Sequence, residues 1–389
     1  GNDDPSQGHD LRQTTMKSSA AKKTELAEKL VYSFGDGKAE GSAAMKNTLG
    51  GKGANLADMC ALGLPVPPGF TIPTDVCVAY YAADKNFPEA LAAQVNAGVA
   101  AIETIVGRQF GDAKNPLLLS VRSGARASMP GMMDTILNLG MTTEVLAGFY
   151  DRGEKEFGGM LYERFVNGWE ETVSKEVEVA IPNDPWEQLT SALIAVIKSW
   201  DNPRARVYRE HHGISHALGT AVNVQAMVYG NRDDRSGTGV VFSHNMNTGE
   251  HALYGEFLPL AQGEEVVAGV RTPLAIEFLK SWNGSVYDEL YAATNLLATH
   301  EQSMVEVEFT IESGVLYFLQ HRKAKASLEA RITSFVHDIW SGAKLRESVY
   351  SYISPEEVEQ VIRTLAVVDP DDEIRSVLAR FRPIQIGRA

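Results

Sequence analysis

Hydrophobic and polar positions follow two different periods along this chain, and each period predicts a different kind of element. From Leu91 to Val106 the apolar residues recur every three or four positions, which is the spacing of one buried helix face. Residues 150–215 carry further runs of this kind, broken at Pro203, and are expected to be helical. From Thr220 onward apolar and polar residues alternate, as they do in strands. The two periods together favour an α+β fold.

Shorter patterns predict the remaining strands and loops. An apolar stretch that begins at Leu30 comes before a glycine-rich segment, and we expect strand, loop and helix in that order. The run from Leu117 predicts a buried strand that ends at Arg122 and leads into a loop. In the second half, alternation at 222–229, 240–243 and 251–257 predicts an antiparallel sheet of hairpins. The polar, glycine-rich loop at 230–239 is either a lid over a nucleotide or a plain connection.

The segment that ends at Arg322 carries the most informative pattern. Apolar residues alternate with Glu306 and Glu308, so the two acids share one strand face. A three-residue loop, 312–314, then leads into the partner strand. Under that register the pairs are Glu308 with Phe318, Glu306 with Gln320, and Met304 with Arg322. A two-residue loop would shift the pairing by one and turn Gln320 and Arg322 to the opposite face from the acids.

Two carboxylates, an amide oxygen and a guanidinium on one sheet face suit Mg²⁺ that bridges polyphosphate oxygens. Mg²⁺ prefers hard oxygen ligands and takes one or two carboxylates, with phosphates and water completing its shell. Arg322 would offer a planar fork to a phosphoryl group. A strand face whose charges are merely solvated explains the same pattern, so the hairpin alone leaves the choice open.

Two cationic segments upstream are further candidates for phosphate binding. In the run from Gly50 to Gly53, small residues would let the backbone approach phosphate while Lys52 supplies charge. The run lacks the spacing of a Walker A loop. Arg122 and Arg126 flank a Ser/Gly loop and would be phosphate clamps or surface cations. Each signal is ambiguous by itself.

Composition limits the classes of function and the compartment. A net charge of −14 over 389 residues argues against broad binding of nucleic acid, and the length predicts two or three cores. Cys60 and Cys77 are too few for a disulfide framework, and no apolar run reaches membrane-spanning length. We therefore expect a cytoplasmic or organellar protein that is not secreted.

Several runs, in order, resemble pyruvate phosphate dikinases over residues 30 to 325. The resemblance is carried by 49–56, 65–70, 219–225, 236–240, 254–257, 261–264 and 308–312 with Leu319-Gln320, and above all by the long run 120–135. It implies an ATP-grasp fold, in which two lobes clasp ATP. The two lobes would be an N-terminal one with a helical segment at 26–215 and a C-terminal one at 216–325. Outside them, the polar composition of 1–25 predicts a flexible leader, and apolar residues at helix spacing in 326–389 predict a helical connector toward a phosphohistidine domain.

The resemblance also implies a role for individual residues. Lys52 and Arg122 would bind the nucleotide phosphates, Gly131 would lie in a loop that closes over them, and Arg322 would bind the terminal phosphate. Mg²⁺ would be held by Glu308 and Gln320, with Glu306 as a further acid. The strand and loop from Gln225 through Met227 to Asn231 would contact adenine, chiefly through backbone. The loop that contains Ser236, Gly237, Thr238 and Gly239 would cover the phosphates.

The family reaction converts ATP, phosphate and pyruvate to AMP, diphosphate and phosphoenolpyruvate. ATP passes its β-phosphoryl group to a histidine on a separate domain, and pyruvate is bound by a third domain, a barrel, in an enzyme that is a homodimer at full length. The histidine lies in a Gly-Gly-Met-Thr-Ser-His-type segment that is absent here, so this chain would be an incomplete phosphotransferase. The alternatives are a pyruvate, water dikinase or related module, and a nucleotide-sensing protein without catalysis.

The chain departs from the family pattern at several positions. His244-Asn245-Met246 replaces an expected Arg-Asn-Pro, and His321 stands where a small polar residue is usual. Residues 150–185 are shorter and more divergent than the family suggests. Nothing in the sequence explains His321.

Overall fold

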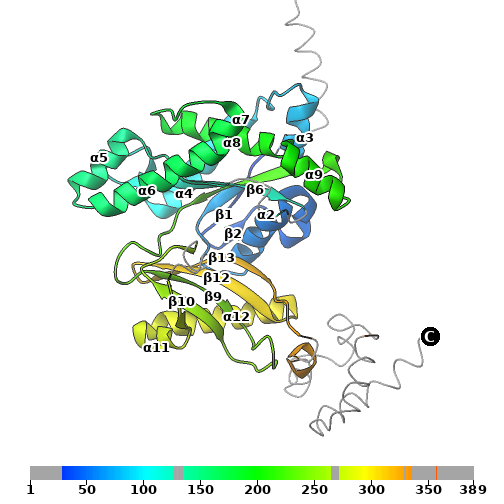
Figure 1. The fold of residues 1–389 in the computed structure, drawn as a ribbon, viewed down its shortest axis with the longest axis vertical. Helices are drawn as coiled ribbons and strands as arrows, with labels where there is room; N and C mark the ends of the chain where they lie inside the picture. The colour runs from blue at the N-terminus through cyan, green and yellow to red at the C-terminus, as the bar shows by residue number, and fades with distance from the viewer. Residues whose placement is uncertain are drawn as a thin grey trace, which may run out of the picture. The chain divides into compact units, whose positions relative to one another are not determined.

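The chain forms two compact units, 1–227 and 228–389, and each is described by itself (Figure 1). A computed structural model describes residues 29–126, 129, 135–263, 271–327, 330–334 and 356. The expected leader, Gly131 and most of the expected helical connector lie outside these residues.

The first unit is built on a six-stranded sheet in the order β2-β1-β3-β8-β6-β7, and every neighbouring pair is antiparallel. A separate parallel pair, β4 and β5, lies between α4 and β6 in the chain. The strands are β1 (Tyr32–Gly35), β2 (Lys38–Ala39), β3 (Gly69–Ile72), β4 (Gln109–Phe110), β5 (Pro116–Leu117), β6 (Leu119–Ala125), β7 (Thr135–Leu139) and β8 (Thr220–Ala226).

The predicted helices of this unit are confirmed. Side chains of Asp184 and Asn202 accept hydrogen bonds from the first turns of α8 and α9, and Pro185 and Pro203 follow them directly. Short helical turns lie at Ala43–Met45, Trp169–Val173 and His216–Leu218. The helices are α2 (Lys46–Ala61), α3 (Thr74–Ala82), α4 (Leu91–Val106), α5 (Thr143–Asp151), α6 (Lys155–Gly168), α7 (Ser174–Val177), α8 (Pro185–Ser199) and α9 (Pro203–His211).

Strand β8 was correctly predicted as a strand, but it belongs to a different sheet from the one expected. It lies between β3 and β6 in the first unit, and all seven of its residues are buried. A strand in the middle of a covered sheet has no solvent face, so alternation of residue types alone did not reveal its neighbours. The first compact unit accordingly extends to Met227 and includes β8.

The second unit contains a five-stranded antiparallel sheet in the order β11-β10-β9-β12-β13. Helix α12 packs along β12 and β13 (Figure 1). The aromatic rings of Phe257, Phe309 and Phe318 are fully buried in this unit. Its elements are β9 (Gly237–Phe242), β10 (Tyr254–Pro259), β11 (Leu274–Ala275), α11 (Phe278–Trp282), α12 (Gly284–Glu301), β12 (Val305–Glu312) and β13 (Val315–Lys323).

Candidate functional site

The β12–β13 hairpin has a register different from the one expected. Its turn contains two residues, Ser313 and Gly314, because Glu312 pairs with Val315. Both turn residues have positive φ, at 49° and 83°, as a tight hairpin turn requires. The expected three-residue loop and its pairs are therefore wrong.

A β-bulge nevertheless places the polar side chains on one face. The register shifts between Glu308 and Phe309, so that Leu319 is the extra residue on β13. Beyond the bulge Glu308 lies opposite Gln320, and Glu306 lies opposite Arg322. The bulge thus reverses the change of face that a two-residue turn would otherwise impose.

Glu306 and Arg322 form a two-pronged ion pair on this face. Arg322 donates from Nε to one carboxylate oxygen and from Nη2 to the other, both at 2.8 Å. These hydrogen bonds raise the pKa of Arg322, and the nearby charges of Glu306 and Glu308 act in the same direction. The arginine side chain is 61% exposed and that of Glu306 is 16% exposed, so the guanidinium is held in place and still accessible.

The residues present fit a magnesium ion. Glu308 and Gln320 face each other across a ladder position, where Cβ atoms are about 5 Å apart. One carboxylate and one amide oxygen from the protein leave the remaining positions of an octahedron to phosphate and water, which is how Mg²⁺ is usually held with nucleotides. Glu306 adds negative charge at the next outward-facing position and also orients Arg322.

In the first unit, the glycine-rich segment forms a kink inside α2. Gly50 has φ 71° and ψ 172°, which is not helical, and the helix continues from Gly51. A Cβ at Gly50 would lie 2.0 Å from the carbonyl oxygen of Gly124 on β6, so only glycine fits here. The kink gives the following turn a new amino end that carries Lys52, and backbone N–H groups at such an end favour anions.

Arg122 lies in the middle of β6, because the strand continues to Ala125 instead of ending at Arg122 as expected. It pairs with Asn223 of β8 and Thr135 of β7, and Asn223 pairs with Thr71 of β3. Residues directly opposite one another share a sheet face, so these four side chains form a polar row. A Cβ on Gly53 of α2 would approach Thr71 and Asn223 within 3.1 Å, which places α2 over the row.

Asn223 adds a buried polar donor to this row. Its Oδ1 accepts a hydrogen bond from Thr71 at 2.7 Å. Its Nδ2 is buried and, within the described part of the chain, has no hydrogen-bond partner. A buried donor beside an arginine and a helix amino end suits an anion or its bound water. The expected site residues did not include Asn223, although a polar residue amid buried valines was a usable signal.

Gln225, Met227, Gly237 and Gly239, which were also predicted site residues, form contacts within the protein. Gln225 donates to the carbonyl oxygen of Pro67 at 2.9 Å, and the amide of Met227 donates to Leu118. Residues 237–239 form the start of β9, between β10 and β12, so the expected loop ends before them. Cβ atoms at Gly237 and Gly239 would meet the rings of Phe257 and Phe309, which explains these glycines by packing.

Asp233, which was not among the expected site residues, links the loop before β9 to the β12–β13 turn through hydrogen bonds. Its carboxylate accepts from Ser236 Oγ at 2.8 Å and from Ser313 Oγ at 2.5 Å. Ser236 Oγ in turn accepts from the Ser313 amide, and the Gly314 amide donates to Arg235. We call Asp233, Ser236 and Ser313 the turn clasp.

Comparison with known proteins decides the family. The model of the pyruvate phosphate dikinase AMP/ATP-binding domain matches residues 46–96 and 83–285. The chain belongs to this family. A pyruvate, phosphate dikinase of Rhizobium meliloti (strain 1021) is 41% identical over 417 residues, which cover 93% of the chain and 46% of that protein. Pyruvate, phosphate dikinase 1, chloroplastic, of Arabidopsis thaliana is 38% identical over 407 residues, which cover 94% of the chain and 42% of that protein.

The chain thus spans less than half the length of these curated relatives. Among the described residues, none of the helices has the length and apolar character needed to cross a bilayer. Lys52 and Arg122 belong to one unit and the hairpin residues to the other, and their joint use of one nucleotide stays a prediction.

Proposed function

We propose that the chain is the ATP-binding part of a pyruvate, phosphate dikinase. In this reaction the β-phosphoryl group of ATP leaves AMP, carrying the γ-phosphoryl with it, and forms a bond to a histidine of another domain. Inorganic phosphate then accepts the terminal phosphoryl group and becomes diphosphate. Pyruvate accepts the phosphoryl group that remains on the histidine and becomes phosphoenolpyruvate. The histidine, the pyruvate-binding barrel and a homodimer are the partners that this proposal requires beyond the present residues.

The chain's own residues would align and neutralise the triphosphate. Glu308 and Gln320 would hold Mg²⁺, with Glu306 beside them, and the ion would offset charge on the phosphate oxygens. The guanidinium of Arg322 would exchange one of its hydrogen bonds to Glu306 for a hydrogen bond to a phosphoryl group. Lys52, Arg122 and Gly131 would bind or cover phosphates from the other lobe of an ATP-grasp fold, in which positioning and electrostatics supply most of the catalysis.

The adenine side would be formed by the chain between Gln225 and Asn231. The side chain of Gln225 already donates a hydrogen bond to the carbonyl oxygen of Pro67. Adenine would therefore be recognised by backbone groups, including those at Met227. Residues 236–239 would support the phosphate side as the first part of β9. The two cysteines are buried and not disulfide-bonded, which favours a reducing cytoplasmic or organellar compartment.

One observation carries this proposal: the bulge in β13 sets Gln320 opposite Glu308 and Arg322 opposite Glu306. Without the bulge, the amide and guanidinium would be on the opposite face from the acids. Carboxylate, amide and guanidinium in neighbouring ladder positions form a donor set for Mg²⁺ and phosphate together.

Calorimetric titration of the 389-residue chain with ATP and Mg²⁺ tests the binding step. Glu308→Ala and Arg322→Ala should each weaken binding on the order of tenfold or more, since each removes a charged contact to the ligand. Lys323→Ala is the matched control, because it removes a neighbouring exposed cation and should leave affinity within about twofold. Wild-type affinity in both site variants, with unchanged circular dichroism, would refute the assignment.

Transfer is tested separately by supplying a phosphohistidine domain from a related dikinase. Label from β-³²P ATP should appear on its histidine, with release of AMP, and Arg322→Ala should abolish the labelling. Tight binding of ATP with no labelling would instead indicate a nucleotide-sensing protein.

A further inference from the structure

The face of β13 that points away from the proposed metal ligands contains an unexpected polar residue, His321. It lies opposite Val307 on the buried side of the hairpin, and its side chain is 1% exposed. An imidazole among apolar neighbours requires a hydrogen-bond partner to offset its lost hydration.

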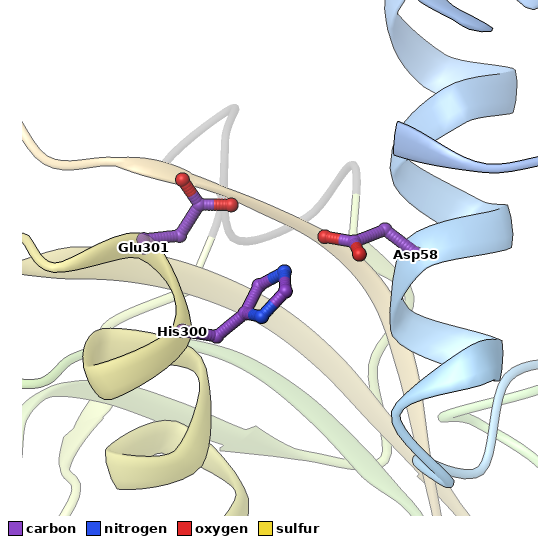
Figure 2. A group of neighbouring side chains, drawn as sticks. All are labelled: Asp58, His300 and Glu301. Carbon is purple, nitrogen blue, oxygen red and sulfur yellow. The ribbon is translucent and has the colours of Figure 1, made fainter. Parts of the chain in front are cut away.

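Glu301 provides that partner. It ends α12, next to His300 (Figure 2). His321 Nε2 lies 3.0 Å from its carboxylate, whose side chain is 24% exposed. The hydrogen bond from His321 is the main cause that lowers the pKa of Glu301, so the carboxylate is ionised at neutral pH. Lys323 Nζ is more distant, at 4.0 Å.

The hydrogen bond between His321 and Glu301 is compatible with only one of two strand registers at the end of β13, the register with the bulge and not the register without it. The two-residue turn fixes the pairing as far as Phe309 with Phe318. Without the bulge, the same pairing would continue, placing Gln320 opposite Val307 and turning His321 outward opposite Glu306. Only the bulged register places His321 under α12, within reach of Glu301.

We propose that Glu301 and His321 are positioning residues for the metal-binding face: their hydrogen bond holds the bulge so that Gln320 lies opposite Glu308 and Arg322 opposite Glu306. This inference rests on the proposed function, because its consequence is the affinity for Mg²⁺. It also explains why a histidine occupies position 321, since a small polar side chain there is too short to span the same distance to Glu301.

The test measures how much Mg²⁺ the 389-residue chain needs for half-maximal ATP binding. Glu301→Ala and His321→Ala should each raise that concentration about five- to tenfold, which corresponds to the net contribution of about one hydrogen bond. Glu301→Gln keeps an acceptor oxygen and should restore most of the affinity. The double alanine variant should be no worse than the poorer single variant, because the two residues act through one contact. Lys323→Ala is the control and should change little.

Amide hydrogen exchange provides a second measurement that does not depend on nucleotide. Both alanine variants should exchange faster at residues 319–322 than the wild type, while β9 and β10 stay protected. If His321→Ala fails to fold, Glu301→Ala at the surface end of α12 still decides the question. Unchanged Mg²⁺ dependence and unchanged exchange in folded variants would overturn the inference. If the wild type does not bind ATP with Mg²⁺, the proposed function fails, and the exchange data alone decide whether the bond holds the bulge.

Discussion

At the scale of single residues, the candidate site depends on positions where only one residue type fits. Gly50 combines a positive φ with a carbonyl oxygen in the space a Cβ would fill. That close approach sets the amino end of the turn carrying Lys52 against β6, the strand of Arg122. The glycines of this segment were expected to allow phosphate to approach. In the structure, the lack of a side chain at Gly50 and Gly53 allows α2 to pack closely against the strands of the sheet.

Replacing Gly50 by alanine should therefore cost more than the backbone strain alone. We expect Gly50→Ala to lower the free energy of unfolding by about 3 kcal/mol or more, since strain and a steric clash add. Gly63→Ala is the matched control: Gly63 has φ 84°, and a Cβ there would meet no atom within 4 Å, so the change should cost only about 1 kcal/mol. Urea denaturation measures both. Equal losses would show that the contact with Gly124 is unimportant.

At the scale of elements, local sequence patterns predicted most helices and strands. Contacts between residues far apart in sequence determined which strands pair and in which register. The spacing from Leu91 predicted α4 because a helix face is a local property. The sheet that holds β8 depends on β3 and β6, which lie far away in sequence. The bulge in β13 depends likewise on α12, through His321 and Glu301. The hairpin prediction therefore put the right residues on one face with the wrong turn and the wrong pairs.

The turn clasp should make the second unit sensitive to acid. Burial raises the pKa of Asp233, but hydrogen bonds from Ser313, Ser236 and the Arg235 amide outweigh it, and the net pKa lies below the ordinary value. A carboxyl whose pKa is lower in the folded state stabilises the fold above its unfolded pKa. That stability is lost as the pH falls from about 4 through the lower folded value.

Asp233→Asn separates this contribution from the other carboxyls. The variant should unfold at a lower urea concentration than the wild type at pH 6, and the difference between the two should shrink as the pH falls below about 4. Ser313→Ala should show a smaller loss at pH 6, because Ser236 and the Arg235 amide still bind Asp233. A difference between Asp233→Asn and wild type that stays constant over this range would contradict the role of the ionised clasp.

At the scale of the whole molecule, the candidate residues are divided between two units. One unit supplies cations on a helix turn and a strand, and the other supplies acids, an amide and an arginine on a hairpin. The chain as a whole has a net charge of −14, so attraction of a nucleotide would have to come from local cations such as these and not from net charge. The proposed function requires that both sets of residues bind the same nucleotide, and a linkage experiment tests this.

A ligand that binds only the folded chain raises its stability by RT ln(1 + [L]/Kd), which is about 2.7 kcal/mol at one hundred times Kd. Mg²⁺ with ATP should therefore raise the thermal midpoint of the wild type, with one site per chain by calorimetry. Arg122→Ala in the first unit and Arg322→Ala in the second should each remove most of that rise, because both would contact the same triphosphate. Combining them should add little once binding is already lost. If Arg322→Ala removed the rise while Arg122→Ala preserved it, the nucleotide would be held by the hairpin alone, and the first unit would need another ligand for its polar row.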